Sequence, residues 1–135
     1  MGLGRGWAPV GERTLRAAVT GVFLVGAGMK LATLPFEVSS FARFGYAPWF
    51  MYLIGVAQLL GAALLWVPGW IGLAALGLGA MMVGAAASHL LAGDPTVMAL
   101  PATALAVVLL TMAYARRGEV ATRRERRTLP GRARL

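Results

Sequence analysis

Three strongly polar side chains lie inside otherwise apolar stretches of this 135-residue sequence: Lys30, Gln58 and His89. Such groups are costly within a membrane and commonly mark binding sites or proton pathways. Lysine donates hydrogen bonds, a side-chain amide donates and accepts them, and histidine titrates near neutral pH. We therefore expect a ligand-binding site formed by these residues with Glu37 and Asp94. His89 is the candidate for proton handling, and no residue is assigned as catalytic.

Structural roles are the alternative for each of these residues. Lys30 can form an ion pair with Glu37 or Asp94, or extend outward to lipid phosphate. His89 can donate a hydrogen bond to Asp94, and Gln58 can join two helices. A single histidine and the lack of cysteine exclude paired-histidine haem ligation, thiolate sites and multi-histidine metal sites within one chain. We expect no metal and no covalently bound cofactor.

The composition indicates which environment, membrane or water, surrounds the elements that must position these residues. The chain is 59% hydrophobic and 13% charged, whereas soluble domains are about 45–50% apolar and about 25% charged. Four apolar stretches are each long enough, as helices, to cross a hydrocarbon core of about 30 Å. They cover residues 14–34, 48–67, 71–92 and 97–115. We predict an all-α fold, an integral membrane four-helix bundle of antiparallel up-down topology, within one membrane domain, residues 14–115.

Arginines at the two ends orient this bundle. Three of the twelve lie before the first apolar stretch or in its first turn, and eight lie within the last twenty residues. Because positive charge favours the cytoplasmic side and the number of spans is even, we expect both termini to be cytoplasmic. The predicted location is the bacterial cytoplasmic (inner) membrane, with a cytoplasmic segment at 1–13 and a basic, disordered tail at 116–135. The tail would be drawn to anionic lipid, and the lack of interleaved aromatics argues against nucleic acid as a partner.

The connection at residues 35–47 is the one long loop between the predicted spans, and it is rich in aromatic residues. We expect it at the outer interface as a short amphipathic helix, or alternatively as a lid over the helix ends. Small residues allow membrane helices to approach closely. They predict packing faces within the bundle or, as an alternative, a homodimer surface. These residues are Gly26, Gly55, Gly61, Ala80, Gly84 and Ser88.

The polar residues lie within recognisable short motifs. These are GAGMKL at 26–31, FGYAPW at 44–49, IGVAQLLGA at 54–62, and HL at 89–90 followed by GD at 93–94. On these motifs, residues 21–95 resemble the DoxX/DoxX-like family of small four-helix membrane proteins. Its relatives include the small subunit of a thiosulfate:quinone oxidoreductase, membrane partners of oxidative-stress enzyme complexes and, more distantly, assembly chaperones for receptor channels. Many relatives carry Glu at the position of Gln58, and an amide cannot relay protons as a carboxylate does.

The resemblance implies a membrane subunit or anchor of an oxidoreductase system, working with a partner protein. Such a protein would bind a quinone or similar lipophilic molecule near the outer ends of the helices. Lys30 and Gln58 would donate hydrogen bonds to a carbonyl oxygen, and His89 would handle the proton. Whether the chain is itself an enzyme stays open. The alternative is a non-enzymatic scaffold or assembly factor. A small multidrug-type transporter has less support because neither Glu37 nor Asp94 lies mid-span.

Overall fold

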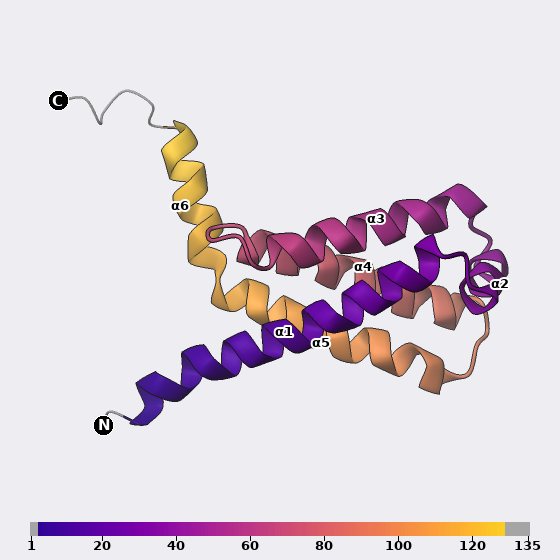
Figure 1. The fold of residues 1–135 in the computed structure, drawn as a ribbon, viewed down its shortest axis with the longest axis horizontal. Coiled ribbons are helices and arrows are strands. Elements are labelled where there is room, and N and C mark those ends of the chain that lie inside the picture. Colours follow the sequence, from indigo (N-terminus) through magenta and orange to yellow (C-terminus); the bar gives the residue numbers. More distant parts are fainter. Residues whose placement is uncertain (1–2, 129–135) are drawn as a thin grey trace. The chain divides into compact units, whose positions relative to one another are not determined.

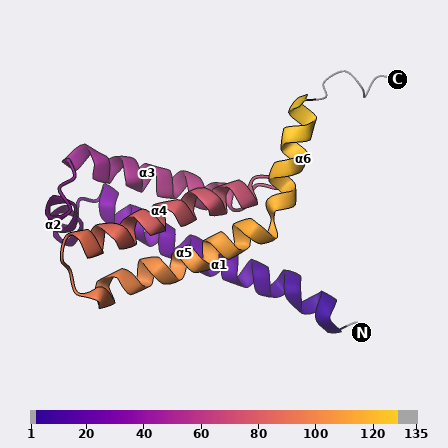
Figure 2. The same ribbon diagram turned by 180° about the vertical axis from the view of Figure 1, so that it is seen from behind.

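A computed structural model describes residues 3–128, with the backbone alone for residues 3–9, 120, 123, 126 and 128. Every element in this range is a helix. One compact unit ends at Ala63, and its helices are α1 (Leu3–Leu31), α2 (Pro35–Arg43) and α3 (Pro48–Leu64) (Figure 1). The other unit contains α4 (Ile71–Leu91), the short 3₁₀ helix η1 (Thr96–Ala99), α5 (Leu100–Ala115) and α6 (Arg117–Thr128) (Figure 2).

Three helical stretches are long and apolar enough to cross a membrane, namely Val10–Leu31, Ile71–Leu91 and Thr96–Ala115. Large apolar side chains such as Val25 and Leu60 are well exposed on the helices, and a lipid environment accommodates such surface better than water does. The chain is therefore a membrane protein with three or four candidate spans.

The fourth candidate span depends on α3, which has 17 residues and so covers about 25 Å. It passes the same test only together with α2, and the two helices are bent by 115° at their junction. The predicted second span reaches residue 67, but the helix ends at Leu64. Pro68 has no N–H to donate to the carbonyl of Leu64, and it disfavours helical geometry at Val67.

The end of α1 comes before the predicted boundary at residue 34 because the chain turns at Thr33. This residue has a φ of 59°, in the left-handed region. The N–H of Leu34 donates to the carbonyl of Met29 at 3.1 Å, and that of Thr33 donates to Lys30, also at 3.1 Å. These two bonds form a Schellman motif, in which the left-handed position is usually glycine. The motif ends α1 and lets α2 start in a new direction.

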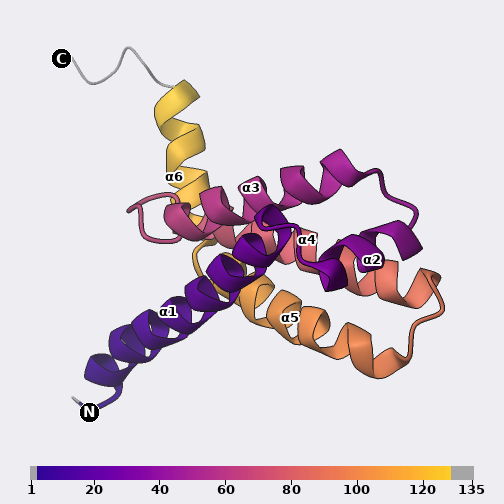
Figure 3. The ribbon, with the colours of Figure 1, turned by 45° about the vertical axis from the view of Figure 1, so that its right-hand side comes forward.

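Of the two forms expected for the connection at 35–47, the structure shows the short helix, α2, between α1 and α3 (Figure 3). It ends at Arg43, and the chain turns at Gly45, which has a φ of 82°; there the N–H of Tyr46 donates to the carbonyl of Phe41 at 3.0 Å. The ring centroids of Tyr46 and Phe50 then lie 4.8 Å apart, and those of Phe41 and Tyr46 lie 6.0 Å apart. An aromatic cluster therefore joins α2 to the start of α3.

Close packing between α4 and α5 occurs at two glycines that the sequence analysis did not select. A Cβ added at Gly79 would lie 2.8 Å from Cδ2 of Leu110, and one added at Gly72 would lie 3.0 Å from the carbonyl oxygen of Arg116. Such distances leave no room for a side chain. Gly72 and Gly79, seven residues apart on one side of α4, therefore set the approach of the two helices.

The packing predicted at Ala80 and Gly84, within the bundle or at a homodimer surface, stays a prediction, although neither residue is buried against α5. Both residues are exposed, and a Cβ added at Gly84 would have nothing within 4 Å. Ser88 is buried, but its hydroxyl donates to the carbonyl of Gly84 in its own helix at 2.8 Å. Small residues occur on every side of α4, so their spacing alone does not select the face that meets α5.

The basic tail departs from the predicted disorder, because residues Arg117–Thr128 form α6, which turns away from the direction of α5 (Figure 2). Glu119 explains the difference. One carboxylate oxygen accepts from Nη1 of Arg116 at 2.6 Å, and the other accepts from the N–H of Gly72 at 3.1 Å. Glu119 also suits the first turn of a helix electrostatically. Residues 129–135, the rest of the predicted tail, lie outside the described residues.

Candidate functional site

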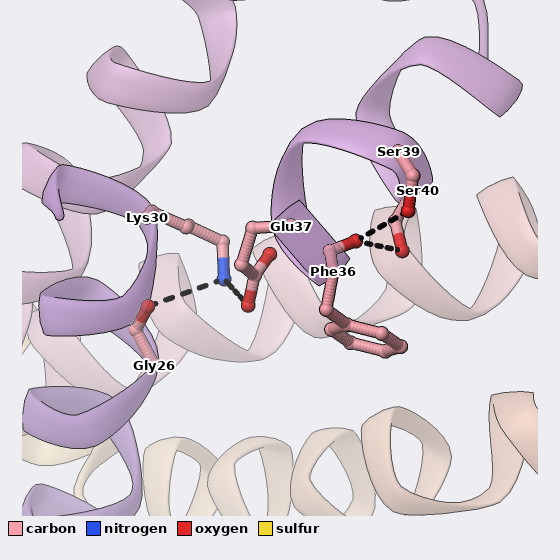
Figure 4. A network of polar contacts seen from close by, with 6 residues as sticks. All are labelled: Gly26, Lys30, Phe36, Glu37, Ser39 and Ser40. Atoms are coloured by element: carbon pink, nitrogen blue, oxygen red, sulfur yellow. Dashed lines mark hydrogen bonds and ion pairs between the residues drawn. The ribbon is translucent and has the colours of Figure 1, made fainter. Parts of the chain in front are cut away.

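Lys30 and Glu37 form an ion pair across the turn between α1 and α2. Lys30 lies in the last turn of α1 and Glu37 in the first turn of α2. Nζ lies 3.3 Å from Oε1, and the side chains are only 12% and 11% exposed (Figure 4). Nζ also lies 3.5 Å from the carbonyl oxygen of Gly26. The turn at Thr33 therefore positions two opposite charges so that each compensates the other.

The surroundings of Lys30 are aromatic as well as acidic. Its Nζ lies 6.0 Å from the ring centroid of Phe41, at the outer limit of a cation–π contact. The hydroxyls of Ser39 and Ser40 donate to the carbonyl of Phe36 at 3.0 and 2.8 Å (Figure 4). These two hydroxyls therefore bind the backbone of α2, and Glu37 is the α2 side chain that pairs with Lys30.

Gln58 contributes the second polar group, from α3. It is 4% exposed, and its Oε1 is buried with no hydrogen-bond partner among the described residues. A Cβ added at Gly26 would lie 3.7 Å from this oxygen and 3.9 Å from Nζ of Lys30. Gly26 therefore leaves a methyl-sized gap beside both polar atoms. A buried carbonyl oxygen without a partner costs about 1–3 kcal/mol, which is why such atoms call for an explanation.

Gly55 allows α3 to approach the end of α1. A Cβ added there would lie 3.2 Å from Cγ of Leu31 and 3.3 Å from Cβ of Lys30. The hydroxyls of Thr33 and Tyr52 share a hydrogen bond of 2.9 Å between the same two segments. This close contact places Gln58, about one turn further along α3, next to Gly26.

His89 and Asp94 pair at the end of α4. Nδ1 of His89 lies 2.7 Å from Oδ2 of Asp94, and the side chains are 18% and 11% exposed. A second Schellman motif makes this contact: Gly93 has a φ of 77°, and the N–H of Asp94 donates to the carbonyl of His89 at 3.1 Å. The carboxylate orients the imidazole and selects which ring nitrogen faces it.

The structure thus shows two polar groups, one in each unit. Around Gly26 it brings together Lys30, Glu37 and Gln58, and at the end of α4 it brings together His89 and Asp94. A joint site of all five residues stays a prediction. Gly61 is half-buried. No group of three metal-ligating side chains occurs within residues 3–128.

Arg16 is a buried cation whose burial the sequence analysis missed. It is 8% exposed, although its position suggests only a flanking charge of the first span. The signal is helical spacing, because Val19 and Phe23 are also buried and fall on the same side of α1. Reading that periodicity back to Arg16 places it on the buried face of the helix.

Comparison with known proteins gives one family match over most of the described chain. The model of the DoxX-like family matches residues 14–111. This range begins within α1, contains both polar groups, ends within α5 and leaves out α6. Neither the curated proteins nor the solved structures give a match.

Proposed function

Because the chain belongs to the DoxX-like family, we propose that it is a membrane subunit or anchor of an oxidoreductase system. In this proposal it resides in the bacterial cytoplasmic membrane and binds a quinone or a similar lipophilic molecule. The family supports the role in the membrane. The unpartnered Oε1 of Gln58, beside Nζ of Lys30, is the observation that supports ligand binding.

The residues around Gly26 fit the hydrogen-bonding groups of a quinone. A bound quinone would supply two-electron redox chemistry, and its carbonyl oxygens accept hydrogen bonds, whereas the hydroxyls of the reduced form donate them. An ammonium has three donors, and two acceptors, Glu37 and the carbonyl of Gly26, lie near Nζ of Lys30. The third donor of Lys30 is then available to a carbonyl oxygen of the ligand.

Gln58 takes a different role from the one expected from sequence. We expected its amide to donate to the ligand, but the buried atom that lacks a partner in the described part of the chain is its acceptor oxygen. In the proposal, Oε1 accepts from a ligand hydroxyl and so favours the reduced form. Because an amide does not titrate, Gln58 positions the ligand and takes no proton.

The proposed topology has four antiparallel spans, with α3 as the shortest and both termini cytoplasmic. The C-terminal end of α1, which carries Lys30, then faces the outer side of the membrane. α2 would lie along that interface, as its 115° bend from α3 favours. A lipophilic ligand could reach Gly26 from the bilayer without entering water.

Ligand binding is tested on the purified full-length chain in lipid nanodiscs. We expect a quinone to be found in the extracted lipids, and a short-chain benzoquinone to quench tryptophan fluorescence on titration. Gln58→Leu should weaken binding of the corresponding hydroquinone about tenfold, and Gly26→Ala should weaken binding of both the quinone and the hydroquinone by a similar factor. The first removes a buried hydrogen bond and the second fills the space beside it.

Gly28→Ala is the matched control, because Gly28 lies in the same helix and a Cβ added there would have nothing within 4 Å. It should leave the affinity unchanged. His89→Ala is titrated in parallel, and a lower affinity would add the second polar group to the site. A preparation without quinone, in which Lys30→Ala binds the benzoquinone and Gln58→Leu binds the hydroquinone as tightly as the parent chain, would contradict the proposed site.

A non-enzymatic scaffold or assembly factor is the second candidate. It is favoured by the exposed small residues Ala80 and Gly84 on α4, which leave a surface where another membrane helix or a second copy could pack. Cross-linking followed by affinity capture distinguishes the scaffold from the ligand-binding subunit. A scaffold keeps its partner when Lys30, Gln58 and His89 are replaced by apolar residues.

A further inference from the structure

An open groove of about 750 Å³ lies where α4, α5 and α6 meet, within the second unit. Its floor is apolar and includes Leu76 of α4 and Leu110 of α5. Its rim carries Arg117, Arg124 and Glu125 of α6. No residue of the candidate site takes part in it, so the groove is a separate feature of the fold.

The groove has a polar end and an apolar end that follow membrane depth. α4 begins at Ile71 and α5 ends at Ala115, so these residues would mark one edge of the hydrocarbon core if both candidate spans cross the membrane. Leu76 and Leu110 each lie five residues inside that edge, at a depth of about 7.5 Å. The arginines of α6 would then lie beyond this edge, where lipid headgroups are.

Contacts of α6 with its neighbours fix the rim. Glu119 binds the side chain of Arg116 and the backbone N–H of Gly72. The guanidinium of Arg117 lies 4.2 Å from the ring centroid of Tyr114, and its Nη1 donates to the carbonyl of that residue at 2.9 Å. Arg116 pairs with Glu119 and does not line the groove, whereas Arg117 and Arg124 do.

We propose that this groove binds an anionic phospholipid. The phosphate would lie against Arg117 and Arg124, since guanidinium groups present forked donors that match phosphate oxygens. One acyl chain would lie along Leu76, which is 48% exposed, and along Leu110. A soluble anion would leave this apolar floor uncovered, whereas a lipid satisfies both ends of the groove. Glu125 opposes the charge of the rim and so tunes the affinity.

Native mass spectrometry of the full-length chain in detergent micelles tests the proposal. The probes are dioleoylphosphatidylglycerol, which is anionic, and dioleoylphosphatidylcholine, which has the same chains and no net charge. We expect one retained phosphatidylglycerol and weaker binding of phosphatidylcholine. Arg117→Gln and Arg124→Gln should each weaken phosphatidylglycerol binding about fivefold, and Glu125→Gln should strengthen it. Leu76→Gln should weaken the binding of both lipids.

Arg127→Gln is the matched control, because Arg127 is an exposed residue of the same helix that does not line the groove. It should change the affinity less than about twofold. Circular dichroism checks that each variant keeps its helix content. Equal binding of the two lipids would overturn the proposal, as would an equal effect of Arg124→Gln and Arg127→Gln. Displacement of the lipid by glycerol phosphate, which lacks acyl chains, would also overturn it.

Discussion

Lys30 and Glu37 stabilise each other at a position where neither charge is well hydrated. Their side chains are 12% and 11% exposed, and the charged atoms lie 3.3 Å apart. We expect Glu37→Gln to lower the free energy of unfolding by about 1–3 kcal/mol, because it leaves a largely buried ammonium with a weaker acceptor. The double substitution of Lys30→Met with Glu37→Leu should cost less than this single change, because apolar residues of similar size often replace a buried ion pair without loss.

Thermal unfolding in detergent, followed by circular dichroism, measures both variants. The order of the midpoints is the test, with the parent chain highest, the double variant next and Glu37→Gln lowest. A midpoint of Glu37→Gln equal to that of the parent chain would show that the pair adds nothing to stability.

Sequence alone predicted part of the site at this scale. The pairing of Lys30 with Glu37 is one of the alternatives, because the two residues are seven positions apart at a span end, with Pro35 between them. The gap beside Gly26 could not be predicted, because it depends on how closely Gly55 lets α3 approach α1 and on which atom of the Gln58 amide is left without a partner. Those are properties of a contact between helices that are distant in sequence.

At the scale of elements, the packing of α4 on α5 depends on Gly79. We expect Gly79→Ala to lower the free energy of unfolding by about 1–3 kcal/mol, because its Cβ would lie 2.8 Å from Cδ2 of Leu110 and displace that side chain from its contact with α4. Gly77→Ala is the control, since a Cβ added there meets nothing within 4 Å. The same thermal unfolding applies, and equal midpoints for the two variants would show that Gly79 does not set the packing.

Helix boundaries were predictable where turn residues mark them. The third span was predicted at 71–92 and the helix covers Ile71–Leu91, because Pro68 and Gly69 precede it and Gly93 and Pro95 follow. The end of α1 was not predictable, because Thr33 takes a left-handed conformation that glycine usually takes. α6 was missed because its first turn depends on a contact between Glu119 and the distant Gly72.

At the scale of the whole molecule, composition and charge predicted a helical membrane protein, and the family match and the apolar helices confirm this. The number of crossings rests on α3. Three helices qualify as spans alone, and α3 qualifies only together with α2. If α3 crosses, the arginine-rich ends share one side of the membrane, as positive charge in cytoplasmic segments favours.

Reporter fusions to the two ends of the full-length chain measure the number of crossings most directly. Alkaline phosphatase is active only outside the cytoplasm, and green fluorescent protein exported in unfolded form fluoresces only inside it. Four crossings predict fluorescent and phosphatase-inactive fusions at both the amino and the carboxyl end. Phosphatase activity at one end and fluorescence at the other would mean an odd number of crossings, and it would contradict the four-span account.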